Sequence, residues 1–164
     1  MITVHATKKL MAKLPVDKDG QLLLQESTDY LAGRGGSEVS PLGSWHANLL
    51  TLQRRNCVLL VHDQTRFPLF IPALKKADLA NFNWWFCDAL MNTLLKCGAT
   101  DRLMDQAAAM LHRLHVDTVC DRSVQGTMNQ MGVTLSTCST MTRSMWPRLP
   151  AIAWVPGWRT GPAR

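Results

Sequence analysis

The sequence lacks any apolar run close to the roughly 20 residues that a membrane-spanning helix needs. Its first residues, MITVHATKK, also lack the basic start and the long apolar stretch of a secretory signal. Its five cysteines are odd in number and form no CxxC pair, which argues against both a disulfide framework and a zinc knuckle. These absences predict a cytoplasmic protein that has buried free thiols and no association with membranes.

Negative charge is missing from the last fifth of the chain. All 12 acidic residues precede Gly132, whereas residues 132–164 carry Arg143, Arg148, Arg159 and Arg164. The net charge of +6 therefore belongs mostly to this tail, and without its four arginines 14 basic residues face 12 acidic ones. A nearly neutral body gives no electrostatic support to phosphate binding, so the charge of residues 1–131 does not favour nucleic acid as a partner.

Alternating apolar residues predict several strands. MITVHAT has the period of a half-buried strand, and the segments SWHANLLTLQ, CVLLVHD and FPLFIPA are separated by turns, which is typical of antiparallel strands. Pro68 and Pro72 cannot donate to a ladder, so FPLFIPA is expected at a sheet edge or a strand end. VDTVC is a candidate for a last short strand.

Helical spacing and capping residues predict the helices. A short helix is expected after Thr7, a second over residues 22–32, a long one over residues 79–96 between Asp78 and the C-terminal cap Gly98, and another after Thr100. Together these patterns predict one α+β domain over residues 1–131, with a small, mostly antiparallel sheet and with helices packed on one face.

The segment DRSVQGTMNQM predicts a helix capped by Asp121. Val124, Met128 and Met131 share one face, as core residues do. Gly126 costs about 1 kcal/mol relative to alanine within a helix, so it indicates a close backbone approach. One interpretation is a binding groove flanked by Arg122 and Asn129, and the other is tight packing on the sheet with Arg122 paired to Asp117.

Other candidate sites each lack a necessary partner. His112 and His115 are spaced to share a metal on a helix, yet no third ligand at helical spacing accompanies them. Cys57 with His46 or His62 would form a thiol and base across neighbouring strands, but strand thiols are usually buried and inert. The sequence therefore predicts no metal site and no cofactor, and it favours the absence of enzymatic activity without excluding it.

Four segments together identify a resemblance. TKKL, WHANLL, LLVHDQTRFPLFIPA and DRSVQGTMN, in this order over residues 1–131, resemble a bacterial domain of unknown function that is sometimes found with plasmid ORF-3-like proteins. The resemblance implies no activity. It implies characteristic positions at Trp45, Asn48, Thr65, Arg122, Ser123, Gly126 and Asn129. Tryptophan is most simply a core anchor, so the candidate binding residues are Asn48, Thr65, Arg122, Ser123, Gly126 and Asn129.

Three functions are compatible with these residues. The first is a cytoplasmic interaction or binding module that has a protein partner and is linked to mobile genetic elements. The second is a small enzyme acting on nucleic acid or a nucleotide, with Asn48, Arg122 and Ser123 as polar site residues. The third is the regulatory partner of a toxin–antitoxin-like pair. A concave pocket that collects Asn48, Thr65 and Arg122 would favour the enzyme, and a flat or apolar exposed patch would favour the binding module.

Residues 132–164 differ in composition from the rest of the chain. They contain four prolines and three tryptophans, and they lack Asp, Glu and Lys, which is unlike the outside of a domain. The resemblance also stops at Met131. This composition predicts an irregular tail, and we interpret it as a segment translated in a shifted reading frame.

The tail prediction has a physical and a genetic test. Limited trypsin digestion should cut at Arg143, Arg148 and Arg159 before any site within residues 1–131, because irregular chain is the preferred substrate of proteases. A resistant tail would show that these residues are ordered. Independent sequence reads of the gene from several isolates that support an intact frame around the codons for Met131 and Gly132 would rule out the frameshift.

Overall fold

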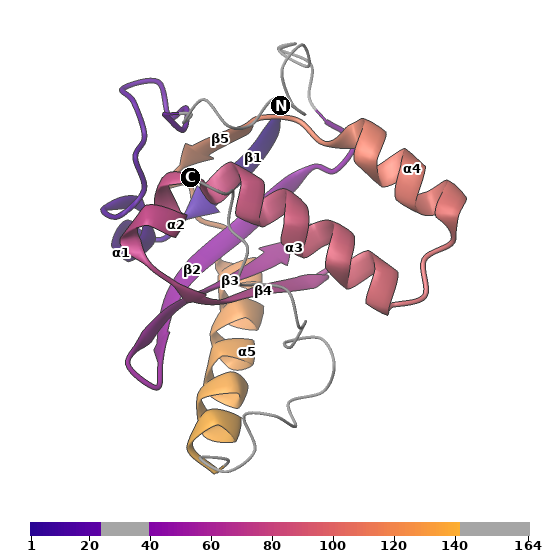
Figure 1. The fold of residues 1–164 in the computed structure, drawn as a ribbon. Helices are drawn as coiled ribbons and strands as arrows, with labels where there is room; N and C mark the ends of the chain where they lie inside the picture. Colours follow the sequence, from indigo (N-terminus) through magenta and orange to yellow (C-terminus); the bar gives the residue numbers. More distant parts are fainter. Residues whose placement is uncertain (24–39, 142–164) are drawn as a thin grey trace.

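The fold is built on a five-stranded sheet with the strand order β4-β3-β2-β1-β5 (Figure 1). The computed structural model describes residues 1–23 and 40–141. The strands are β1 (Ile2–Ala6), β2 (Ser44–Leu52), β3 (Arg55–His62), β4 (Pro68–Leu74) and β5 (Leu114–Asp117). The α+β class is confirmed, and the predicted antiparallel strands β2, β3 and β4 pair as expected.

The sheet is mixed, so the prediction of a mostly antiparallel sheet is wrong. β1 pairs in parallel with β2 on one side and with β5 on the other. Short turns between strands indicate antiparallel pairs in the sequence. Parallel strands are connected by long crossover segments, which leave no local signal of the pairing. β4 is an edge strand, as its two prolines predicted.

Five helices are described: α1 (Lys8–Met11), α2 (Lys76–Ala80), α3 (Phe82–Lys96), α4 (Asp101–Met110) and α5 (Arg122–Met141). The expected helix over residues 79–96 is divided at Asn81, and Asp78 accepts the backbone N–H of Lys75 at the start of α2. The caps at Gly98 and Thr100 are confirmed. Most of the helix expected over residues 22–32 lies outside the described residues. None of the described helices is both long and apolar enough to cross a membrane.

The two faces of the sheet are covered by different helices. Val58 and Leu60 of β3 pack in the main core together with α3, which crosses the sheet in Figure 1. Their neighbours Leu59 and Val61 pack against Val124 and Met128 of α5 in a second core. The prediction that the helices lie on one face is therefore wrong. The continuous apolar run CVLLV is the sequence signal for a strand that is buried on both faces.

Helix α5 continues past the boundary that the sequence predicted at Met131. Gly132 is buried, and Leu135 packs against the second core. The apolar stripe of α5 therefore continues at helical spacing beyond the position where the composition of the chain changes. The rest of the predicted irregular tail, from residue 142 onward, lies outside the described residues.

The burial of α3 predicts a stability difference along one helix. Trp85 and Phe86 are buried as expected, and Phe86 contacts Trp45 edge to face at a centroid distance of 5.4 Å. Phe86→Ala should lower the free energy of unfolding by about 3–5 kcal/mol, because it removes a fully buried ring. Leu95→Ala on the same helix, at a residue that is 60% exposed, should change it by less than about 0.5 kcal/mol. Urea denaturation measures both, and equal effects would contradict the placement of α3.

Candidate functional site

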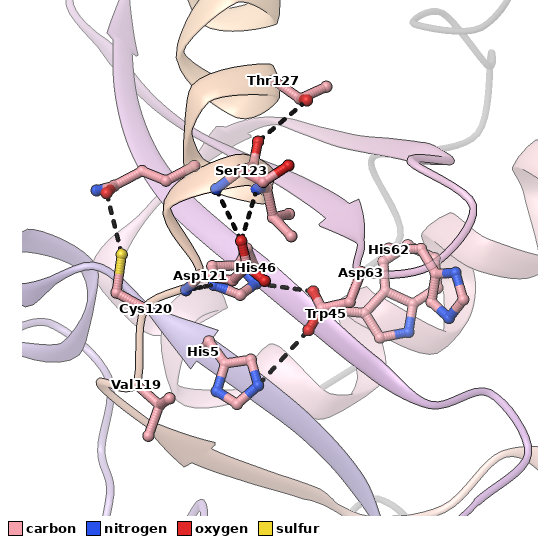
Figure 2. Close-up of polar contacts among 12 residues, drawn as sticks. His5, Trp45, His46, His62, Asp63, Val119, Cys120, Asp121, Ser123 and Thr127 are labelled. Carbon is pink, nitrogen blue, oxygen red and sulfur yellow. Dashed lines mark hydrogen bonds and ion pairs between the residues drawn. The ribbon is translucent and has the colours of Figure 1, made fainter.

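A row of polar side chains crosses three strands on the face that α5 covers. The strand register places His5 of β1 beside His46 of β2 and Asp117 of β5. Val4, Trp45 and Val116, which precede them in sequence, all belong to the main core on the opposite face. Asp63 follows the end of β3 and completes a group that we call the His–Asp cluster: His5, His46, Asp63 and Asp117. Figure 2 shows three of its members, His5, His46 and Asp63.

His46 has hydrogen-bond partners on both ring nitrogens. Its Nε2 accepts the backbone N–H of Asp121 at 2.8 Å, and its Nδ1 lies 2.7 Å from Oδ1 of Asp63. Because a backbone N–H can only donate, Nε2 is the unprotonated nitrogen, and Nδ1–H donates to the carboxylate. The side chain is only 4% exposed. His46 therefore connects β2, the end of β3 and the start of α5.

His5 lies between two carboxylates. Its Nδ1 is 2.5 Å from Oδ1 of Asp117, a short hydrogen bond, whereas its Nε2 is 3.7 Å from Oδ2 of Asp63, which is beyond hydrogen-bonding distance. Its ring centroid stands 4.8 Å from that of His46. Asp63 therefore directs one carboxylate oxygen toward each histidine. Its Oδ1 is within hydrogen-bonding distance of His46, whereas its Oδ2 lies too far from His5 for a hydrogen bond.

Asp121 caps α5 as the sequence predicted. Its Oδ1 accepts the backbone N–H groups of Val124 at 3.2 Å and Ser123 at 2.7 Å (Figure 2). These two hydrogen bonds stabilise the ionised carboxylate and lower the pKa of Asp121. Since the backbone N–H of the same residue donates to His46, the start of α5 is fixed both along the helix and against the sheet.

A pocket of about 230 Å³ lies beside the cluster. Cys120 is in its wall, and the thiol donates to Oε1 of Gln125 at 3.0 Å. The volume is below the roughly 300–1,000 Å³ that is typical of pockets for drug-sized ligands. The lining residues come from the end of β1, from the start of α1 and its cap Thr7, from β2, from the segment after β5 and from α5: His5, Ala6, Thr7, Lys8, His46, Thr118, Val119, Cys120, Gln125 and Met128.

The candidate binding residues are distributed around this region, and none of them lines the pocket. Asn48 accepts the hydroxyl of Thr7 at 3.1 Å, so it lies next to a pocket residue. Thr65 contacts His62 in the turn between β3 and β4, and Ser123 accepts Nη2 of Arg66 at 3.0 Å. Arg122 and Asn129 are exposed on α5. The pocket beside the cluster is lined by none of Asn48, Thr65 and Arg122, which the enzyme hypothesis required together.

Gly126 does not mark a close approach, so the reason given for a groove there is wrong. A Cβ atom built at Gly126 would meet no described atom within 4 Å. At Gly132 it would lie 3.4 Å from Cδ2 of Leu50 on β2. Four residues separate Met128 from Gly132, which places Gly132 on the face that packs on the sheet, while Gly126 points outward.

The weaker candidates from the sequence do not form sites in the described residues. Cys57 lies opposite Leu50, and burial raises the pKa of its thiol, whereas His46 and His62 contact other groups. α4 ends at Met110, so His112 and His115 do not share a helix. Asp117 pairs with His5, and not with Arg122 as suggested.

Sequence reasoning missed most of the cluster. It considered His46 only as a base for Cys57, and it gave no role to His5 or Asp63. The available signal was positional, because His5 and His46 occupy polar positions in alternating strands. Its meaning depends on the parallel pairing of β1 with β2, which the sequence did not reveal.

The fold and the site define an α+β domain with a His–Asp cluster beside a small pocket. The chain belongs to the family described as Domain of unknown function (DUF6933), whose model matches residues 3–145. The predicted resemblance to a domain of unknown function is confirmed, and the match continues past Met131, where it was expected to stop. No curated protein and no solved structure shows a significant match to the chain.

The two glycines of α5 predict opposite responses to the same substitution. Gly126→Leu should leave stability unchanged or raise it by up to about 1 kcal/mol, because leucine favours the helix and the position faces open space. Gly132→Leu should lower stability by about 1–3 kcal/mol, because the larger side chain must displace Leu50. Thermal unfolding compares the two variants, and greater damage from the change at residue 126 would contradict this assignment.

Proposed function

We propose that the domain is a binding module whose site is the pocket beside the His–Asp cluster. The observation that carries this proposal is the engagement of the His46 ring, whose two nitrogens hold Asp63 and the start of α5. A histidine with both nitrogens occupied in this way has no lone pair available to act as a general base in the pocket. Thr7, Lys8 and Gln125 remain as lining groups that can contact a ligand.

The size and the edge of the pocket support a protein partner that inserts one side chain. A space of about 230 Å³ suits a small polar group better than a nucleotide. Val119 lines this pocket and is 64% exposed as a residue, so a protein partner would cover it. Lys8 and the hydroxyl of Thr7 favour a carboxylate or amide side chain as the inserted group.

The proposal also includes the cellular location and the genetic context that were expected for a binding module. A link to mobile genetic elements is supported by the sequence resemblance, and a cytoplasmic location remains part of the proposal. A regulatory role in a toxin–antitoxin-like pair is one form that protein binding would take. The alternative of a small enzyme acting on nucleic acid or a nucleotide is less well supported, because the pocket is small and does not collect its expected residues.

Filling the pocket tests the proposal. Blocked single amino acids, namely N-acetyl amides of Asp, Asn, Glu and Gln, are titrated into ¹⁵N-labelled protein and followed by NMR. We expect shifts at the backbone amides of Thr7, Thr118 and Gln125 with millimolar affinity, which corresponds to about −4 kcal/mol. Gln125→Trp, which places an indole in the pocket, should abolish these shifts. Gln130→Trp, on an exposed position of the same helix, should preserve them.

Three outcomes would contradict the proposal. The first is that no probe shifts any backbone amide. The second is that the shifts are equal in Gln125→Trp and Gln130→Trp. The third is that only amides away from the pocket shift. AMP serves as the comparison ligand. Shifts of the pocket amides by AMP that exceed those of all four amino acid probes would favour the nucleotide enzyme instead.

A further inference from the structure

We propose that the His–Asp cluster holds a divalent transition-metal ion between Nε2 of His5 and Oδ2 of Asp63. The ion can bind whether or not a partner side chain occupies the pocket, so this inference goes beyond the proposed binding function. The distance of 3.7 Å between these two atoms is too long for a hydrogen bond, yet the atoms belong to adjacent side chains in one cluster. Two ligands that are each about 2.1 Å from one ion stand roughly 3–3.6 Å apart, which is close to the observed gap.

The groups behind the two ligands hold them in the orientation that a metal requires. The short contact of Asp117 with Nδ1 of His5 places the proton on Nδ1 and leaves the Nε2 lone pair directed at Asp63. A carboxylate that orients a ligating histidine in this way is a recurrent feature of metal sites. On the other side, Nδ1–H of His46 donates to Oδ1 of Asp63, so Oδ2 remains for the ion.

His46 is a positioning residue in this arrangement. His5, His46 and Asp63 place their candidate ligand atoms within 4.8 Å of one another, so distance alone would admit His46 as a third ligand. Ligation through Nδ1 would put the proton on Nε2, which would then face the backbone N–H of Asp121 donor to donor at 2.8 Å. The hydrogen bonds therefore assign His46 to the support of Asp63.

The ligand set defines the class of ion and the openness of the site. Imidazole with carboxylate suits zinc and its first-row neighbours better than calcium or magnesium, which prefer oxygen ligands alone. Two protein ligands leave several coordination positions for water. His5 also lines the pocket, so these positions are accessible from it. An open site of this kind binds its ion more weakly than a closed structural zinc site.

The alternative to a metal ion between Nε2 of His5 and Oδ2 of Asp63 is a proton on Nε2. If His5 is an imidazolium that pairs with both Asp117 and Asp63, the same side chains form a purely structural ion-pair network, and no metal binds. The two arrangements differ in one measurable respect, because only the metal site has an unprotonated Nε2 on His5 that changes its environment when Zn²⁺ is added.

The test uses the full chain, freed of metal by EDTA and titrated with Zn²⁺. Isothermal titration calorimetry measures affinity, and the imidazole ¹⁵N resonances report which nitrogen is bound. We expect a Zn²⁺-dependent shift at Nε2 of His5. His5→Gln and Asp63→Asn should each weaken this binding at least about tenfold, and Asp117→Asn should weaken it by about 10–100-fold through loss of orientation.

Two further variants separate ligands from neighbours. His46→Gln should keep the affinity within about threefold, because a glutamine amide can donate to Asp63 and accept from the backbone N–H of Asp121. Cys120→Ser should leave the affinity unchanged, since the thiol donates to Gln125 in the pocket wall and does not belong to the group of ligand atoms formed by His5, His46 and Asp63. Thermal unfolding without metal verifies that each variant is folded, and Asp63→Ser, which also removes the carboxylate, replaces any Asp63→Asn protein that is not.

The proposal is overturned by any of three results: no Zn²⁺-dependent change at His5, full affinity in Asp63→Asn, or loss of binding in His46→Gln. None of these results depends on the pocket probes. Binding of amino acid probes without Zn²⁺ binding would refute the metal site alone, and the reverse would refute only the proposed binding function.

Discussion

The hydrogen bonds of one buried imidazole, that of His46, fix the position of helix α5 against the sheet. The His46 ring accepts a hydrogen bond from the backbone N–H of Asp121 and donates one to the Asp63 carboxylate. One side chain of β2 therefore positions both the start of α5 and the carboxylate that follows β3. A buried polar group that lost either partner would carry an uncompensated desolvation cost of about 1–3 kcal/mol. The direction of α5, the wall of the pocket and the orientation of Asp63 therefore depend on this ring.

The parts of the fold that local sequence encodes were predictable. Turn residues between alternating segments identified β2, β3 and β4 as neighbours, and Thr100, Asp121 and Gly98 identified helix ends by their capping chemistry. The place of β1 was not predictable in this way, because β1 pairs with β2 and β5 across long intervening segments. A strand register between distant segments has no signature in the sequence of either segment.

The site was hidden for the same reason. His5 and Asp117 are 112 positions apart and meet only because β1 and β5 are neighbours. Among the residues that the family resemblance implied, Asn48 accepts a hydrogen bond from the pocket residue Thr7 and Ser123 accepts one from Arg66, whereas Gly126 faces outward. Extending the helical stripe beyond Met131 would have identified Gly132 as the glycine that approaches the sheet.

The prolines of β4 limit how this domain can associate with other chains. Exposed edge strands commonly recruit another strand through their unpaired N–H and C=O groups, both in peptide recognition and in aggregation. Pro68 and Pro72 remove two donors from the outer edge of β4, and β5 at the opposite edge has only four residues. Neither edge offers the long, regular ladder that strand addition requires. The sheet is thereby protected against self-templated growth, and association must depend on side chains more than on the backbone.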